Sequence, residues 1–436
     1  MNKQLFKSLF VVSTLAFSLF SCQNESLDVE NIELAPSALN HELVMKSIYA
    51  ESETISLSKN TTVGVTDRNP STFANSLINA VRQAGNGGTV QLEAGNYYSD
   101  RTITLPAGIK TTIKGRGKFE TKIFLTKNPG PTPGFININA NGTAFTELLV
   151  DAQNKMQYGA CAINTNGKSD IYLYNVGLVN ASIGTGTSDN GKGLTPAGLT
   201  AIACSFYNCD HGINFNRQYS QTPAPWVKKV TISACWFGGT QAAGVSIDCG
   251  NDGIDGVVFR RGLPGAAEAT VTVTNMDGME IKNSTFEKAS KYNIAIAKAW
   301  NIKIFNNTLK GNTGNILYGE AINLEHETHN IIIEDNKIYN EGLSNQNHSY
   351  ISILTFRDYG NSPLLENGCR DITIRRNEFR GDCKSGIAGE YAQRITINNN
   401  TFSNPRPTIR GINFYVQSSN IWHWSNGVDN TASIVN

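Results

Sequence analysis

Charged residues that could do chemistry gather in the middle of this chain. Glu325 and Glu327 form an acidic pair around His326. Lys298 precedes this pair and Arg357 follows it. Two close carboxylates can bind a cation or act as general acid and base, whereas Lys and Arg can neutralise an anion or, with a depressed pKa, remove a proton. We therefore expect these four residues to form one catalytic site.

Polar residues between apolar strand positions accompany these charges. Pairs such as Ile322 and Leu324 flank Asn323, an alternation that indicates a strand with one buried face. Corresponding strands carry amides, hydroxyls and carboxylates at the polar positions, so we expect a solvent-facing lane for an extended ligand. Nearby arginines could grip acidic groups and tyrosines could stack on sugar rings. The predicted substrate-binding residues are Asn214, Asn216, Asp248, Asn323, Glu390, Tyr391, Asn413, Tyr415, Arg260 and Arg261.

The elements that must position these residues are copies of one repeat. Each copy reads apolar-x-apolar, then a small polar residue or Cys at a bend, then an apolar residue; the copies begin at Ile171, Leu199, Val230, Met279, Ile302, Ile331, Ile372 and Ile395. Period-two alternation indicates strands, and repetition of one unit indicates a solenoid. At the bend we expect a column in which Asn tolerates left-handed backbone and bonds to the amide of the next coil. This column is Ser284, Asn307, Asn336, Asn377 and Asn400.

The N-terminal residues predict export. Residues 1–21 combine two lysines with an apolar stretch, which predicts a signal peptide too short to favour a permanent membrane span. Leu19-Phe20-Ser21-Cys22 resembles the lipobox of bacterial lipoproteins. The resemblance implies a lipid anchor at Cys22 and an extracytoplasmic place on the bacterial outer membrane; an ordinary secretory signal is the alternative. Residues 22–69 are predicted to form a flexible tether, and residues 70–436 a single domain.

Composition narrows the choice of partners. The 436 residues have a formal net charge of +1, so nothing in the balance suggests a nucleic-acid partner, and we expect a monomer. Apart from Cys22, the cysteines show no C-x-x-C pair and no zinc-site spacing. Cys204 and Cys235 are expected to pack as small buried side chains, whereas Cys369 and Cys383 could be oxidised.

The start of the domain resembles a known fold family. An amphipathic helix with an N-cap is predicted from Ser71 and Thr72, and it is followed by Gly-Gly-Thr-Val-x-Leu-x-x-Gly-x-Tyr at residues 87–97. Together with the repeats, this opening resembles the β-helices of the pectate-lyase superfamily. The resemblance implies an all-β, single-stranded right-handed parallel β-helix with a capping helix. Because lyases, hydrolases and phage tailspikes share the motif, it identifies a fold and not a reaction.

The charged cluster partly resembles the family of chondroitinase B and alginate lyases. That resemblance implies that Glu325 and Glu327 bind calcium and that Arg357 assists β-elimination on a uronate-containing polysaccharide. The chain departs from the family where a Lys is expected, because that position falls in the apolar Ile331-Ile332-Ile333; Lys298 is the nearest substitute.

Two other functions stay open. A glycoside hydrolase of an acidic or sulfated polysaccharide needs two carboxylates, and Asp248 with Glu325, or Glu325 with Glu390, would lie two coils apart. Residues 324–330 resemble the catalytic phrase of iota-carrageenases, but His329 stands where an Asp is expected. The third hypothesis is a non-catalytic surface lipoprotein that binds glycans.

Overall fold

The computed structural model describes most of the chain from residue 61 onward. The described residues are 61–186, 198–216, 230–238, 243–248, 279–287, 292–297, 299–310, 320–325, 328–340, 349–354, 369–381, 385–390, 392–403, 410–415, 419–424 and 432–434. All of them belong to one compact unit, Leu57–Asn436. Within these ranges, no helix has both the length and the apolar character needed to span a membrane. The predicted signal peptide, Cys22 and most of the tether lie outside the described residues.

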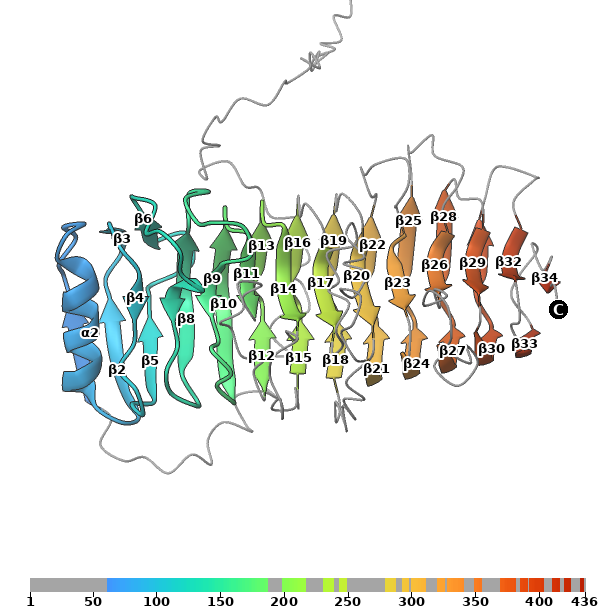
Figure 1. Ribbon diagram of the computed structural model, residues 1–436, viewed down its shortest axis with the longest axis horizontal. Coiled ribbons are helices and arrows are strands. Elements are labelled where there is room, and N and C mark those ends of the chain that lie inside the picture. The colour runs from blue at the N-terminus through green and yellow to red at the C-terminus, as the bar shows by residue number, and fades with distance from the viewer. Residues whose placement is uncertain are drawn as a thin grey trace, which may run out of the picture. The chain divides into compact units, whose positions relative to one another are not determined.

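A strand and a helix close the first coil. Strand β1 (Thr62–Val65) pairs in parallel with β2 (Gly88–Leu92), and helix α2 (Phe73–Ala84) packs on both. The helix lies beside β2 in Figure 1. Phe73, Leu77 and Val81 lie on one helix face and are fully buried, which confirms the predicted capping helix. The expected N-cap bond is absent, because Thr72 already has helical backbone angles and makes no side-chain capping bond. The helix covers strand groups that would otherwise be exposed at the end of the stack.

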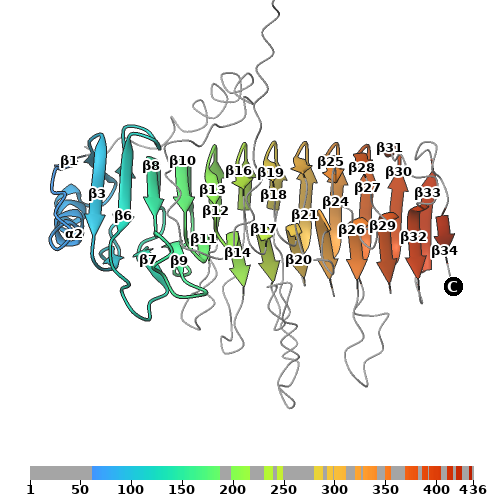
Figure 2. The same cartoon turned by 90° about the horizontal axis from the view of Figure 1, so that it is seen from above.

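One parallel sheet, which we name sheet B, carries the predicted ligand lane. Its neighbouring strands follow the order of the chain and lie side by side in Figure 2. They are β4 (Ile103–Thr104), β7 (Gly134–Asn137), β9 (Cys161–Asn164), β11 (Ile183–Gly186), β14 (His211–Asn216), β17 (Ala243–Asp248), β20 (Tyr292–Ala297), β23 (Ile322–Glu325), β26 (Ser349–Leu354), β29 (Ser385–Glu390), β32 (Arg410–Tyr415) and β34 (Ala432–Ile434).

The other sheet, sheet A, has 22 strands within the described residues and is bent into two rows. After β1, the first row contains β2, β5 (Thr111–Lys114), β8 (Ala144–Asp151), β10 (Ile171–Val179), β12 (Leu199–Ile202), β15 (Val230–Ser233), β18 (Met279–Lys282), β21 (Trp300–Phe305), β24 (His329–Glu334), β27 (Arg370–Arg375), β30 (Gln393–Asn398) and β33 (Ser419–Trp424). The second row contains β3 (Gly95–Ser99), β6 (Thr121–Leu125), β13 (Ser205–Tyr207), β16 (Trp236–Gly238), β19 (Thr285–Glu287), β22 (Thr308–Lys310), β25 (Lys337–Asn340), β28 (Glu378–Gly381) and β31 (Thr401–Ser403). The long strands β8 and β10 belong to both rows.

Every predicted repeat begins within a first-row strand of sheet A, and the apolar members of the repeats fill the interior. Ile302, Ile331, Ile372 and Ile395 follow one another in register and are at most 1% exposed. Such burial of a large aliphatic side chain contributes roughly 1.5–3 kcal/mol relative to exposure. Stacking of the same side chain from coil to coil therefore gives one continuous core, as a parallel β-helix requires.

The predicted amide column is confirmed. Asn336 Nδ2 donates to Asn377 Oδ1 at 2.9 Å, and Asn377 Nδ2 donates to Asn400 Oδ1 at 3.0 Å. The expectation that the column itself has left-handed backbone is wrong, because the residue before each member has positive φ instead. Those residues are Asn283, Asn306, Asp335, Arg376 and Asn399. The left-handed residue turns the chain, so the next side chain enters the interior, where the column members are about 1% exposed.

Candidate active site

The register of sheet B aligns the polar positions of the predicted lane in two columns. Asn164, Gly186, Asn214, Ser246, Ala295, Asn323, Ser352, Ala388 and Asn413 are successive partners along the sheet. A second column, two residues further along each strand, contains Asn216, Asp248, Ala297, Glu325, Leu354, Glu390 and Tyr415. The alternation of apolar and polar residues therefore predicts which residues are register partners along sheet B.

The expected solvent exposure of the first column is wrong for its described amides and hydroxyl. Asn164, Asn214, Asn323 and Ser352 are at most 3% exposed. Contacts between coils account for part of this burial: Asn164 Nδ2 donates to Asn137 Oδ1 at 3.0 Å, and Ser352 Oγ donates to Asn323 Oδ1 at 2.6 Å. Stacked polar side chains thus bond to one another across coils. Substrate contact by Asn214 and Asn323 stays a prediction.

Glu325 is held firmly at the end of β23. Its side chain is 7% exposed, and Asn323 Nδ2 donates to Glu325 Oε1 at 2.5 Å. Ser352 in the next coil bonds to the same Asn323 amide. The Thr328 hydroxyl donates to the Glu325 backbone carbonyl at 2.7 Å and fixes the chain just after the strand. Glu325 is therefore a preorganised carboxylate, as a catalytic or ligand-orienting group must be.

Carboxylates recur at alternate coils of the second column. Ala297 separates Asp248 from Glu325, and Leu354 separates Glu325 from Glu390. Since adjacent strands lie about 4.8 Å apart, backbones two coils apart are separated by roughly 10 Å. The side chain of Glu390 is half-buried. This spacing allows two carboxylates to reach opposite sides of one sugar linkage.

Much of the predicted site falls outside the described part of the chain. Lys298, Glu327, Arg357, Tyr391, Arg260 and Arg261 lie there, and Asn216, Asp248, Asn413 and Tyr415 are described in their backbones only. In sequence, Lys298 directly follows Ala297 and Arg357 comes shortly after Leu354. Ala297 and Leu354 are the two register partners of Glu325. The described register therefore puts the strands that lead to both basic residues on either side of Glu325.

The predicted calcium site lies only partly within the described residues. Within them, no group of three His, Cys, Asp or Glu side chains could hold a metal ion. Of the predicted pair only Glu325 is described, and one of its carboxylate oxygens accepts a bond from Asn323. Glu327 lies outside the described residues, so calcium binding by Glu325 and Glu327 stays a prediction.

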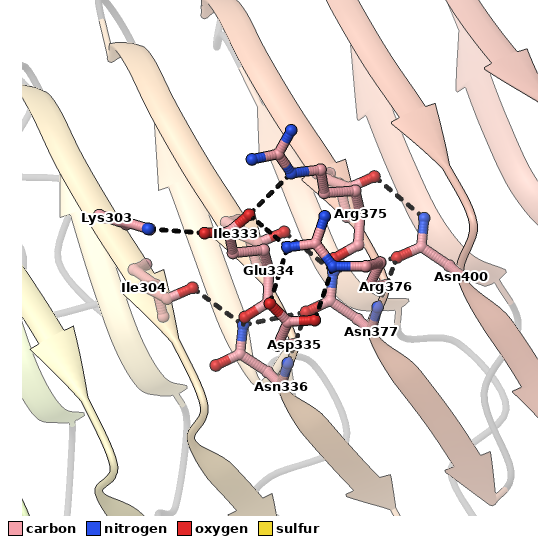
Figure 3. A network of polar contacts seen from close by, with 11 residues as sticks. Lys303, Ile304, Ile333, Glu334, Asp335, Asn336, Arg375, Arg376, Asn377 and Asn400 are labelled. Atoms are coloured by element: carbon pink, nitrogen blue, oxygen red, sulfur yellow. Dashed lines mark hydrogen bonds and ion pairs between the residues drawn. The ribbon is translucent and has the colours of Figure 1, made fainter.

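A charged network on sheet A was not anticipated from the sequence (Figure 3). The carboxylate of Glu334 contacts Lys303, Arg375 and Arg376, each at 2.7 Å. Arg376 also forms two bonds to Asp335, both at 2.8 Å. An alignment of the repeats would have revealed this charged network, because Glu334-Asp335 and Arg375-Arg376 occupy the same positions in adjacent coils.

The environment of Glu334 suits a structural role. Burial alone would raise its pKa, but hydrogen bonds from Lys303, Arg375 and Arg376 outweigh burial and lower the pKa to about 2. The side chain is only 5% exposed. A carboxylate that stays ionised and is saturated by three cations is a poor proton donor or acceptor near neutral pH. We therefore assign Glu334 to stability rather than catalysis.

The described cysteines behave as packing residues. Cys204 and Cys235 are 1% and 2% exposed, which confirms the expected small buried side chains. Cys369 is buried, and its Sγ donates to the Leu324 carbonyl at 3.7 Å. Cys383 lies outside the described residues, so its oxidation with Cys369 stays a prediction.

Comparisons with known proteins identify the fold. A family model described as a right-handed beta helix region matches residues 265–428. The crystal structure of the Agl-KA catalytic domain is 16% identical, with a TM-score of 0.55, and the match covers 87% of this chain and 68% of that one. The catalytic unit of a GH87 alpha-1,3-glucanase from Streptomyces thermodiastaticus is 12% identical, with a TM-score of 0.51, covering 86% and 70%. No curated protein matches the chain.

These likenesses and the sheet topology define the class. The chain forms a right-handed parallel β-helix, the fold that its opening motif and repeats predicted. At such low identity the solved structures show the fold alone. The reaction must be argued from the residues on this particular helix.

Proposed function

We propose that the protein is a carbohydrate-active enzyme that cleaves an extended uronate-containing polysaccharide at the outward face of sheet B, by β-elimination. One observation carries the proposal: Glu325 is held rigidly in a column whose two neighbouring strands, β20 and β26, lead directly to Lys298 and Arg357. A carboxylate and two cations from three adjacent coils are the groups that this reaction needs near one sugar linkage.

In this mechanism the two basic side chains, Lys298 and Arg357, have different roles. One of them neutralises the uronate carboxylate, which makes the proton on C5 more acidic. The other, with its pKa depressed by the first cation, accepts that proton. The electron pair of the C5–H bond forms the C4–C5 double bond, the C4–O bond breaks, and the departing oxygen takes up a proton. Calcium binding at Glu325 and Glu327 stays a separate prediction; the ion would supply further positive charge near the uronate carboxylate.

Hydrolysis is the second candidate, favoured by the alternate-coil spacing of Asp248, Glu325 and Glu390. A pair of carboxylates on backbones roughly 10 Å apart suits an inverting reaction, in which one protonates the leaving oxygen and the other activates water. A solved structure of similar fold is that of an alpha-1,3-glucanase, so this fold can carry the site of a hydrolase.

A polysaccharide panel separates these candidates. The purified chain is incubated with alginate, polygalacturonate, chondroitin sulfate and a neutral glucan, with and without a chelator. New reducing ends with ultraviolet absorbance of an unsaturated uronate indicate elimination, and reducing ends alone indicate hydrolysis. Binding without either product would leave the third hypothesis, a glycan-binding lipoprotein. If a chelator abolishes activity and added calcium restores it, the result would support the predicted calcium binding.

Substitution of the acidic pair tests the place of the reaction. We expect Glu327→Gln to abolish turnover while thermal unfolding changes little. Glu287→Gln is the matched control, because Glu287 lies on β19 of sheet A and pairs with Lys310 at 3.0 Å. Full activity in the Glu327 variant would show that the site lies elsewhere.

We also propose that the protein is a monomer anchored by lipid on Cys22 to the bacterial outer membrane. The support is the apolar stretch before Leu19-Phe20-Ser21-Cys22. Radiolabelled palmitate should enter the wild-type protein and not the Cys22→Ser variant. The variant should leave the membrane fraction; its retention there would contradict the anchor.

A further inference from the structure

A row of half-buried side chains borders the proposed site at the bend between sheets B and A. Trp300, His329, Arg370 and Gln393 are register partners at the starts of β21, β24, β27 and β30, a strand order that can be followed in Figure 1. The indole of Trp300 and the imidazole of His329 stack with ring centroids 4.9 Å apart and planes inclined by 18°. We name these four residues the bend row.

The bend row is fixed to the backbone from coil to coil. The amide of His329 donates to the Ala299 carbonyl at 3.1 Å, and the amide of Arg370 donates to the Thr328 carbonyl at 3.0 Å. The amide of Gln393 donates to the Cys369 carbonyl at 2.9 Å. The residue before each row member is fully buried: Ala299, Thr328, Cys369 and Ala392. The row therefore stands on a rigid base, which reduces the ordering cost of binding a ligand.

Two of these buried residues connect the row to the strand that carries Glu325. The Thr328 hydroxyl donates to the Glu325 carbonyl at 2.7 Å, and the Cys369 thiol donates to the Leu324 carbonyl at 3.7 Å. Trp300 comes shortly after Ala297, the register partner of Glu325. The row and the carboxylate column thus run side by side along the same coils.

We propose that the bend row is a binding subsite for consecutive sugar units of an acidic polysaccharide. Trp300 packs against the core and stacks on His329, so the two rings offer their edges to a sugar chain. Arg370 offers a guanidinium for a carboxylate or sulfate group, and Gln393 offers an amide for hydroxyls. The rise of about 4.8 Å per coil is close to the length of one sugar unit, so an extended chain can place successive units on successive coils. The subsite deepens the proposed function and rests on it for the class of polysaccharide.

Binding is measured apart from cleavage, by affinity electrophoresis of the full chain in gels containing alginate, polygalacturonate, chondroitin sulfate or a neutral glucan. We expect Trp300→Ala to weaken binding to the preferred acidic polysaccharide by roughly threefold to tenfold. Arg370→Gln should cause a comparable loss on acidic polysaccharides and none on the neutral glucan. Thermal unfolding establishes that each variant is folded; Arg370→Gln keeps the test decisive if Trp300→Ala is unstable.

Matched substitutions on another part of sheet A serve as controls. Trp236 is half-buried on β16 and stacks on Tyr207, with ring centroids 5.8 Å apart. Arg380 on β28 forms an ion pair with Glu378. Trp236→Ala and Arg380→Gln should bind like the wild type. Wild-type affinity in both bend-row variants would overturn the subsite, as would a wild-type chain that binds no acidic member of the panel. Absence of cleavage with loss of binding in the variants would instead contradict the proposed function and retain the subsite.

Discussion

Carboxylates on the two sheets have different hydrogen-bonding partners. On sheet A, Glu334 contacts three cations, and these contacts lower its pKa to about 2. On sheet B, Glu325 accepts a bond from the neutral amide of Asn323, which a hydroxyl in the next coil orients in turn. The three cations around Glu334 hold adjacent coils of sheet A together, whereas the Asn323 amide orients the Glu325 carboxylate at the end of β23. Similar residue types on one solenoid can thus serve stability on one face and chemistry on another.

The largest expected effect is on catalysis at sheet B. Glu325→Gln should lower the rate of polysaccharide cleavage at least about a hundredfold, because it removes the carboxylate charge at the centre of the column. The circular dichroism spectrum should stay that of the wild type. Glu334→Gln is the contrasting variant and should keep its cleavage rate at temperatures where it remains folded. Equal loss of rate in both variants would erase the distinction between the sheets.

The next effect concerns the amide column inside sheet A. Asn336→Ala should lower the free energy of unfolding by about 3 kcal/mol, because it leaves buried backbone groups without their partners. Asn336 Nδ2 donates to the carbonyls of Ile304 and Glu334, both at 3.0 Å, and its Oδ1 accepts from the Asn307 amide at 3.0 Å. Urea denaturation measures the change. A loss below about 1 kcal/mol would mean that the column contributes little beyond an ordinary turn.

The charged network should contribute less and should depend on pH. Glu334→Gln should cost on the order of 2 kcal/mol at neutral pH, because three cations lose their shared anion. The folded pKa of Glu334 is about 2, below its ordinary value of 4.5, so its contribution is fully present above pH 4.5 and is lost as pH falls toward 2. The free energies of unfolding of the wild type and the variant should therefore converge as pH falls from 4.5 to 2. A difference in this free energy that stays unchanged near pH 2 would contradict the stabilising role of Glu334.

The smallest effect is expected at an exposed pair. Arg394 bonds to both oxygens of Asp371 at 2.6 Å, and these contacts lower the pKa of Asp371. Both side chains are 43% exposed, so solvent and salt screen the attraction. Arg394→Gln should cost less than about 1 kcal/mol, and the cost should shrink as salt is added to the denaturation experiment.

Much of the fold could be predicted because the repeat carries its own register. The alternation around Ile302, Ile331 and Ile372 sets which residues point inward, and the register then follows for every coil. The amide column around Asn336 and Asn377 was predictable for the same reason.

Exposure and pairing were harder to predict. Sequence alternation separates inward from outward positions, but it does not show that Asn214 and Asn323 are each only 1% exposed. The Glu334 network depends on side chains that reach across coils, and the bend row depends on the positive φ of the residues after Trp300 and His329, Asn301 and Asn330. Such features arise from three-dimensional neighbours, which only the aligned coils reveal.

The most direct measurement is a crystal structure of the Glu325→Gln variant with a bound acidic oligosaccharide. The account predicts that the sugar chain runs along sheet B from coil to coil, with one linkage beside residue 325 and adjoining units against Trp300 and His329. An oligosaccharide bound instead over the second row of sheet A, away from residue 325, would contradict it.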